Sequence, residues 1–294
     1  MNRGDTVNTK KHGENFNSAK MKYKTKTIFC AIAIIFFTAC TSTKKSVSDK
    51  LTDADNRVAS TSGYLHIKTF RGKSFTQNVN LVITLHGDLS NPDYHYLLAE
   101  RIAKDNDNVI AIGMLRPGYK DPEGNRSSGV KGRANGDNYT VEVINDIAAA
   151  IGNLQKKYKP GKTFIAGHSG GAAITADLIS MYPNIANGAI LVSCPCDVPA
   201  FRAHMKTLYS NGGWGATVKS LSPHLQTDKI SKQTRVTIII GEKDDVAPVE
   251  ISNSYYNQLK QQGIDAKLVE IKDKKHNIFL EETVLESIKK MLME

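Results

Sequence analysis

The chain of 294 residues is 40% hydrophobic and 23% charged, with a formal net charge of +10. This composition excludes an intrinsically disordered chain and suits one large α/β core or two smaller ones. The positive charge is scattered along the sequence, with no basic stripe and no nucleic-acid-binding motif, so it indicates a solvated surface and argues against a nucleic-acid partner.

The amino-terminal part of the chain has the features of an export signal. A lysine-rich start leads into an apolar run from Ile28 to Ala39, which has the length of a signal core and is too short to span a bilayer. A signal of ordinary length would begin at Met21, so we expect residues 1–20 to be missing from the mature chain. Without the seven basic and two acidic residues before Cys40, the net charge falls to +5.

The end of this run, Phe37-Thr38-Ala39-Cys40, resembles the lipobox of bacterial lipoproteins, although Phe37 stands where leucine is usual. The resemblance implies a lipid anchor on Cys40, which would hold the protein to the bilayer of a bacterial cell envelope. In a Gram-negative cell this would be the periplasmic face of the outer membrane. The alternative is an ordinary signal and a secreted protein. Residues 41–62 are polar and aperiodic, as expected of a tether.

From Gly63 to Glu294, short β-branched runs alternate with longer segments of helical period, which predicts one α/β domain with a mostly parallel sheet flanked by helices. Strands are expected at 64–70, 81–86, 108–114, 163–167, 189–193, 236–240 and 266–271. Helices are expected at 91–104, 139–158, 171–182, 249–262 and 279–292. Continuous apolar runs such as "VTIII" indicate strands that are buried on both faces.

Two connections, 116–138 and 194–231, are too long for simple turns, and each follows the carboxyl end of an expected strand. Because ligands bind beyond those ends in open α/β sheets, both connections are candidate parts of a site. In the first, Arg116 and Tyr119 are candidates for substrate contact, with a solvated loop as the alternative. In the second, "NGGWGA" indicates a short lid whose Trp214 covers an apolar pocket, with ordinary packing as the alternative.

The stretch "GHSGG" places glycines two residues before and two residues after Ser169, between a buried strand and a helix. Such a G-x-S-x-G turn is sharp and strained, and side chains at the glycine positions would collide with neighbouring backbone. The turn aims the serine hydroxyl away from the sheet. It also points the amide of Gly170 toward the place where an oxyanion would form. This context favours a nucleophilic serine over a chance glycine turn.

A nucleophilic serine needs a base and a group that orients the base, and the sequence supplies both. Asp244 follows a buried strand, three residues after Gly241 and four before Pro248. His276 follows the last expected strand. The chain order Ser169, Asp244, His276 is the order found in α/β-hydrolases.

Other residues near these positions remain as alternatives. Asp245 adjoins the favoured aspartate and is a rival for the acid. Asp197, after the preceding strand, is a second rival, because some hydrolases of this fold keep their acid there. His86 and His168 flank the site, and we expect them to pack against it or support it rather than react.

Together these motifs resemble the α/β-hydrolase superfamily, nearest to its dienelactone-hydrolase and prolyl-oligopeptidase-like branch of serine hydrolases. The likeness is carried by "GHSGG", by "HG" at 86–87 and by the run 222–248 into the acid loop, and it covers about residues 63–292. It implies the α/β-hydrolase fold for residues 63–294, with the lid of the second long connection between strands 6 and 7 in the numbering of that fold.

The resemblance also implies a mechanism. Ser169 would be the nucleophile, His276 the general base and then acid, and Asp244 the residue that holds the imidazole tautomer. The second oxyanion donor would be the backbone amide of Asp88 or Leu89. The predicted activity is hydrolysis of a carboxylic ester through an acyl-enzyme, with no cofactor and no metal. The alternatives are an envelope peptidase acting on short peptides and a non-catalytic binding protein on the same fold.

Two cysteines remain once Cys30 is removed with the signal and Cys40 is lipidated. Cys194 and Cys196 are separated by one proline, and a pair so close does not readily meet disulfide geometry. We therefore expect reduced, partly buried thiols rather than a redox pair. The histidines outside the site show no ligand spacing that would predict a metal.

Overall fold

The computed structural model describes residues 56–294 except 76, 133–135 and 211. The export signal, the lipobox with Cys40 and the tether up to residue 55 lie outside the described residues. Among the described helices, none is both long and apolar enough to cross a membrane. The strands are β1 (Arg57–Ser60), β2 (Gly63–Arg71), β3 (Asn80–Leu85), β4 (Val109–Met114), β5 (Lys162–His168), β6 (Gly188–Val192), β7 (Arg235–Gly241) and β8 (Ala266–Ile271). The α-helices are α1 (Tyr94–Asp105), α2 (Val141–Tyr158), α3 (Gly170–Met181), α4 (Val198–Leu208), α5 (Val249–Gln261) and α6 (Glu282–Met293).

The strands form one eight-stranded sheet in the spatial order β1-β2-β4-β3-β5-β6-β7-β8. Every pairing from β4 to β8 is parallel, whereas β1 with β2 and β2 with β4 are antiparallel. The mostly parallel sheet expected from the sequence is therefore confirmed. Because the parallel strands run in the same direction, their carboxyl ends meet at one edge, where the loops of a site can converge.

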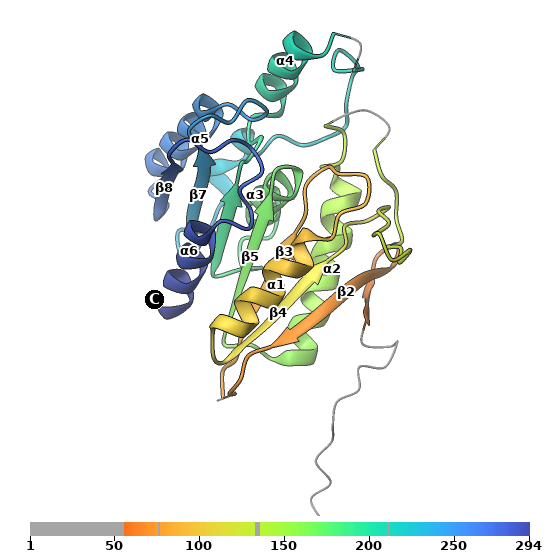
Figure 1. The fold of residues 1–294 in the computed structure, drawn as a ribbon, viewed down its shortest axis with the longest axis vertical. Coiled ribbons are helices and arrows are strands. Elements are labelled where there is room, and N and C mark those ends of the chain that lie inside the picture. The colour runs from red at the N-terminus through yellow and green to blue at the C-terminus, as the bar shows by residue number, and fades with distance from the viewer. Residues whose placement is uncertain (1–55, 76, 133–135, 211) are drawn as a thin grey trace, which may run out of the picture. The chain divides into compact units, whose positions relative to one another are not determined.

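Helices cover both faces of the sheet, and each face has its own apolar core. On one face, α2, α3 and α5 pack against alternate strand residues such as Leu81 and Ile83. On the other face, α1 and α6 pack against the residues between them, such as Val82. In Figure 1, α1 and α6 lie in front of the strands and α2 lies behind them. Burial of both faces explains the continuous apolar strand sequences.

The sheet begins earlier in the chain than the sequence predicts. Residues 57–60, expected to be the end of the tether, form β1 and pair with β2 through contacts such as Val58 with Leu65. Val58 is buried, and the Asp146 carboxylate of α2 accepts hydrogen bonds from the amide of Ser62 and the hydroxyl of Thr61. The folded domain therefore includes this hairpin, which the polar sequence around it concealed.

The second long connection contains a helix that was not predicted. Helix α4 begins after Asp197, whose carboxylate caps it by accepting from the amide of Ala200 at 3.0 Å. Its apolar side chains include Val198, Phe201 and Met205, at helical spacing. Figure 1 shows α4 beyond the carboxyl ends of the central strands, so the lid is a helix followed by the loop that carries the tryptophan.

The expectation of reduced thiols at Cys194 and Cys196 is wrong, because the two residues form a disulfide and are fully buried. Ser193, at the end of β6, takes a positive φ of 51° that turns the chain. The Cα atoms of the two cysteines lie 5.1 Å apart, within the usual range for a disulfide.

Candidate active site

Ser169 lies in the turn between β5 and α3 with φ 51° and ψ −120°, a conformation that costs free energy in a residue with a side chain. The two flanking glycines make this turn sterically possible. A Cβ at Gly167 would lie 2.2 Å from the carbonyl oxygen of Gly171, and one at Gly171 would lie 2.5 Å from that of His86. The backbone here is packed too closely for any side chain, as the motif predicts.

The structure brings the three predicted catalytic side chains into one hydrogen-bonded row. Nε2 of His276 lies 2.9 Å from the hydroxyl oxygen of Ser169. Nδ1 of His276 lies 3.0 and 2.9 Å from the two carboxylate oxygens of Asp244. A carboxylate can only accept, so Nδ1 carries the proton and Nε2 is free to accept the serine proton.

The loop around Asp244 fixes its carboxylate. One oxygen accepts from the amides of Val246 and Ala247 at 3.0 and 2.9 Å, and the side chain is fully buried. The two rival acids are engaged elsewhere. The Asp245 carboxylate is exposed and pairs with Lys275 at 2.8 Å, and Asp197 caps α4. Of the three candidates, only Asp244 contacts His276.

The candidate oxyanion segments also meet beside the serine. A Cβ at Gly170 would lie 2.6 Å from a carboxylate oxygen of Asp88, so the start of α3 touches the loop after β3. Gly87, Asp88 and Leu89 all line the pocket that opens onto Ser169. The amide of Gly87 already donates to the hydroxyl of a tyrosine, which leaves those of the two following residues as candidates for the second donor.

The Asp88 carboxylate is held by three donors. Arg116 donates at 2.8 Å and Tyr119 at 3.0 Å to one oxygen, and Tyr139 donates at 2.8 Å to the other. Burial by itself would raise the pKa of Asp88, but the Arg116 charge and the three hydrogen bonds lower it below its usual value. The carboxylate is therefore ionised and fixed in place.

The structure corrects the prediction that Arg116 and Tyr119 contact substrate. Arg116 is fully buried and Tyr119 is 2% exposed, and neither lines the pocket. Besides Asp88, the Arg116 guanidinium contacts the carbonyl oxygen of His86 at 3.0 Å. Both residues thus support the oxyanion loop from behind. The sequence could not reveal this role, because a charged residue in a long loop is more often solvated.

The pocket over Ser169 has a volume of about 530 Å³ and two kinds of wall. Trp214, predicted as a contact, lines it together with Phe201 and Met205 of α4, and the tryptophan and phenylalanine rings meet edge to face at 5.5 Å. Lys131 and Asn138 supply polar groups. The α4 residues were missed although their spacing of three and four was visible in the sequence.

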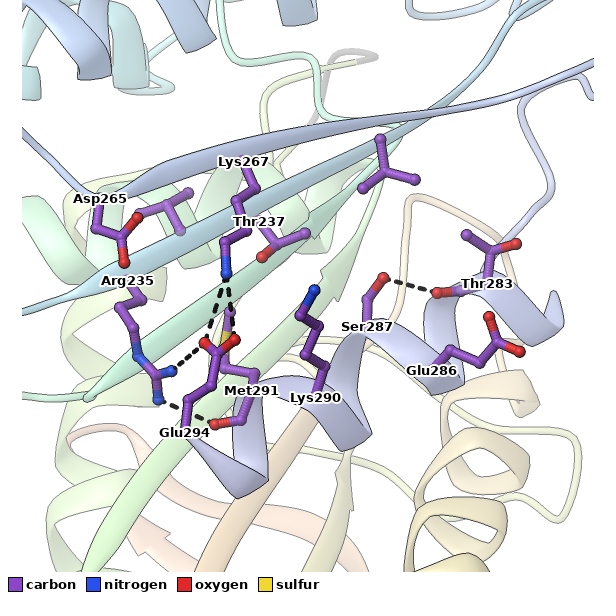
Figure 2. Close-up of a pocket in the computed structure, with 12 residues that line it drawn as sticks. Arg235, Thr237, Asp265, Lys267, Thr283, Glu286, Ser287, Lys290, Met291 and Glu294 are labelled. Atoms are coloured by element: carbon purple, nitrogen blue, oxygen red, sulfur yellow. Dashed lines mark hydrogen bonds and ion pairs between the residues drawn. The ribbon is translucent and has the colours of Figure 1, made fainter.

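A second pocket lies at the amino ends of β7 and β8, away from the carboxyl ends that surround Ser169. Figure 2 shows the side chains that line it. Three of its charged side chains contact one another, because Glu294 lies 2.6 Å from Arg235 and 3.3 Å from Lys267. The Ser287 hydroxyl donates to a backbone carbonyl of its own helix. Among the described residues, no group of three or more His, Cys, Asp or Glu side chains is placed to hold a metal ion.

Comparison with known proteins identifies the family of the chain. The sequence pattern of the prolyl oligopeptidase family matches residues 123–293, a range that includes Ser169, Asp244 and His276. Among curated proteins, no match to the chain is found.

Three solved structures show the same fold. The Pyrococcus furiosus esterase Pf2001 is 20% identical with a TM-score of 0.61, and the match covers 81% of this chain and 90% of that one. Est1E of Butyrivibrio proteoclasticus, solved with ferulic acid, is 19% identical with a TM-score of 0.62, covering 81% and 97%. The Pyrococcus horikoshii acylaminoacyl peptidase is 15% identical with a TM-score of 0.62, but the chain covers only 40% of it and 81% of itself. The fold is thus the α/β-hydrolase fold.

Replacement of Arg116 with methionine should lower the free energy of unfolding by about 2 kcal/mol, because it leaves the Asp88 carboxylate, whose side chain is 26% exposed, without its cation and the His86 carbonyl without its donor. The matched control is Arg101→Met, which removes a half-exposed pair with Glu282 and should cost at most about 1 kcal/mol. Urea denaturation followed by circular dichroism measures both. Equal losses in the two variants would show that the Arg116 pair contributes no more than a surface pair.

Proposed function

The chain belongs to the prolyl oligopeptidase family and is a serine hydrolase, and on that premise we propose that Ser169, His276 and Asp244 are its catalytic triad. The observation that carries the proposal is the 2.9 Å contact between the Ser169 hydroxyl and His276 Nε2, with the other imidazole nitrogen on a buried carboxylate. A bare serine hydroxyl is a weak nucleophile at neutral pH, and an adjacent oriented base is the usual means of activating it.

In the proposed reaction, Ser169 attacks the carbonyl carbon of the substrate while His276 accepts the hydroxyl proton at Nε2. The tetrahedral intermediate then collapses, and His276 gives that proton to the leaving alcohol or amine. Water then attacks the carbonyl carbon of the acyl-enzyme while His276 accepts a proton from it. His276 returns that proton to the oxygen of Ser169, which regenerates the serine and releases the acid. Asp244 holds the Nδ1–H tautomer and stabilises the imidazolium without taking its proton.

The negative oxygen of each intermediate would receive hydrogen bonds from two backbone amides. Gly170, at the amino end of α3, supplies one, and the helix dipole adds to its effect. Asp88 or Leu89 supplies the other. Donors held in place before the reaction are worth several kcal/mol in such sites, because they need no reorganisation as charge develops.

The proposed substrate is a carboxylic ester with an apolar acyl group. Phe201, Met205 and Trp214 form an apolar wall near Ser169 that would accept such a group. The similar structures that the chain covers almost fully are esterases, which supports the ester reading. A peptide substrate is the second candidate, favoured by the acylaminoacyl peptidases among the similar structures.

A finer part of the proposal concerns location. The export signal and the Phe37-Thr38-Ala39-Cys40 run support a protein that is anchored to a bacterial envelope membrane by lipid on Cys40. Radiolabelled palmitate fed to expressing cells should enter the wild type and not a Cys40→Ser variant. Equal labelling of the two proteins would contradict the proposal that Cys40 carries the lipid.

A fluorophosphonate probe should label the purified wild type and leave Ser169→Ala unlabelled, because the probe reacts with an activated serine. The same substitution should lower the turnover of 4-nitrophenyl esters by roughly 10⁶-fold. Ser287→Ala is the matched control, since that hydroxyl donates to a carbonyl of its own helix and lines the other pocket, and this variant should keep its labelling. An unlabelled but folded wild type would favour a binding protein on this fold. A wild type that is labelled and cleaves peptides faster than esters would favour the peptidase.

Asp244→Asn should lower kcat by about 10⁴-fold, since an amide in this position favours the wrong imidazole tautomer. Asp245→Asn is the control, because it changes the neighbouring carboxylate, which pairs with the exposed Lys275. We expect that variant to stay within severalfold of the wild type. Steady-state kinetics on one ester gives kcat for both variants. A larger loss of kcat in Asp245→Asn than in Asp244→Asn would assign the acid to Asp245.

A further inference from the structure

Three hydrogen bonds run behind Ser169 and join the two loops that flank it. The amide nitrogen of Gly87 lies 2.5 Å from the hydroxyl oxygen of Tyr94, at the start of α1. That hydroxyl lies 2.8 Å from Nδ1 of His168, the last residue of β5. Nε2 of His168 lies 3.0 Å from the backbone carbonyl oxygen of His276.

The direction of each bond follows from the chemistry of its ends. A carbonyl oxygen can only accept, so Nε2 of His168 must carry a proton and donate it to His276. Burial, followed by repulsion from the nearby His276 imidazole, lowers the pKa of His168 to about 4, so the ring is neutral near pH 7 and Nδ1 has no proton. Tyr94 therefore donates to Nδ1, and its oxygen is free to accept from Gly87.

Packing holds the two side chains where these bonds require them. The ring of Phe279, from the loop before α6, stacks on the His168 ring at 5.4 Å and meets the Tyr94 ring edge to face at 5.8 Å. His168 is 4% exposed, so water does not compete for its nitrogens. The His276 carbonyl also accepts from the Ser193 hydroxyl at 2.9 Å, which holds it from a second side.

We propose that Tyr94 and His168 are positioning residues that fix the oxyanion loop and the His276 loop relative to each other. The chain of bonds starts at the amide that precedes the two candidate oxyanion donors and ends on the backbone of the proposed base. All three bonds point the same way, so each polarises the next. The inference rests on the proposed function, because its catalytic consequence requires His276 to be the base.

The role explains why the residue before the serine is a histidine, whose ring lines the pocket and lies 5.2 Å from the His276 ring. Neither nitrogen of His168 is free to move a proton of the substrate, because one is occupied by Tyr94 and the other by a carbonyl. Tyr94 lines the pocket, yet its proton is engaged in the same way. Both residues thus act through the backbone they hold, and a small shift of that backbone is costly because catalysis depends on placement within about 1 Å.

The test is a double-mutant cycle of Tyr94→Phe and His168→Leu, with Tyr96→Phe as control. Tyr96 is a buried tyrosine of the same helix whose hydroxyl contacts Asp121 at 3.3 Å, away from Ser169. We expect each single variant of the pair to lower kcat about tenfold with KM within about twofold, since each substitution keeps a side chain of similar size in the pocket wall. The double variant should lose no more than the worse single one. The Tyr96→Phe variant should keep the wild-type kcat.

An unchanged kcat in Tyr94→Phe, or losses that multiply in the double variant, would overturn the positioning role. Imidazole ¹⁵N spectra at pH 7 test the chain without any catalysis. Wild-type His168 should be the neutral Nε2–H tautomer, and Tyr94→Phe should shift mainly its Nδ1 resonance. An Nδ1–H or charged ring would overturn the inference. If the wild type neither reacts with the fluorophosphonate nor hydrolyses substrate, the proposed function fails while the spectra still decide the hydrogen bonds.

Discussion

The close approach of backbone at the Ser169 turn is the constraint on which the rest of the site depends. The turn brings Gly167 within reach of the carbonyl of Gly171, and Gly171 against the end of β3, so the strand, the helix and the oxyanion loop touch without intervening side chains. Because of this contact, the amide of Gly170 and the loop after β3 face the same space. A side chain at either glycine would push apart the groups that the reaction needs together.

A site assembled from four loops has to be held rigid by something other than strand hydrogen bonds, and here buried polar groups do so. The Arg116 cation and two tyrosines fix Asp88 from below the pocket, and the Tyr94 and His168 pair connects the same loop to His276. Such groups contribute little net stability, because burial costs them much of what pairing returns. Their use is geometric, since each hydrogen bond holds its donor and acceptor in one arrangement.

The alternatives that the sequence left open were those that depend on which loops meet. Adjacent aspartates are nearly equivalent in sequence, but at the end of β7 one carboxylate turns inward to the imidazole and Asp245 turns out to a lysine. The sequence around Arg116 is typical of a solvated loop, whereas the fold buries the Arg116 side chain completely. The Cys194 and Cys196 pair forms a disulfide with its Cα atoms 5.1 Å apart, a distance that the spacing of the two cysteines in the sequence did not show.

The sequence by itself determined the alternation of strands and helices, the glycine-flanked serine and the chain order of the three side chains proposed as the triad. These are local properties, because periodicity and the steric demands of a sharp turn act over a few residues. Only the tertiary structure decided that β1 belongs to the sheet, that α4 forms the lid wall, and that Tyr94 and His168 link two loops. The bonds from Tyr94 to His168 and from His168 to His276 join residues 74 and 108 positions apart, and packing of the whole sheet brings them together.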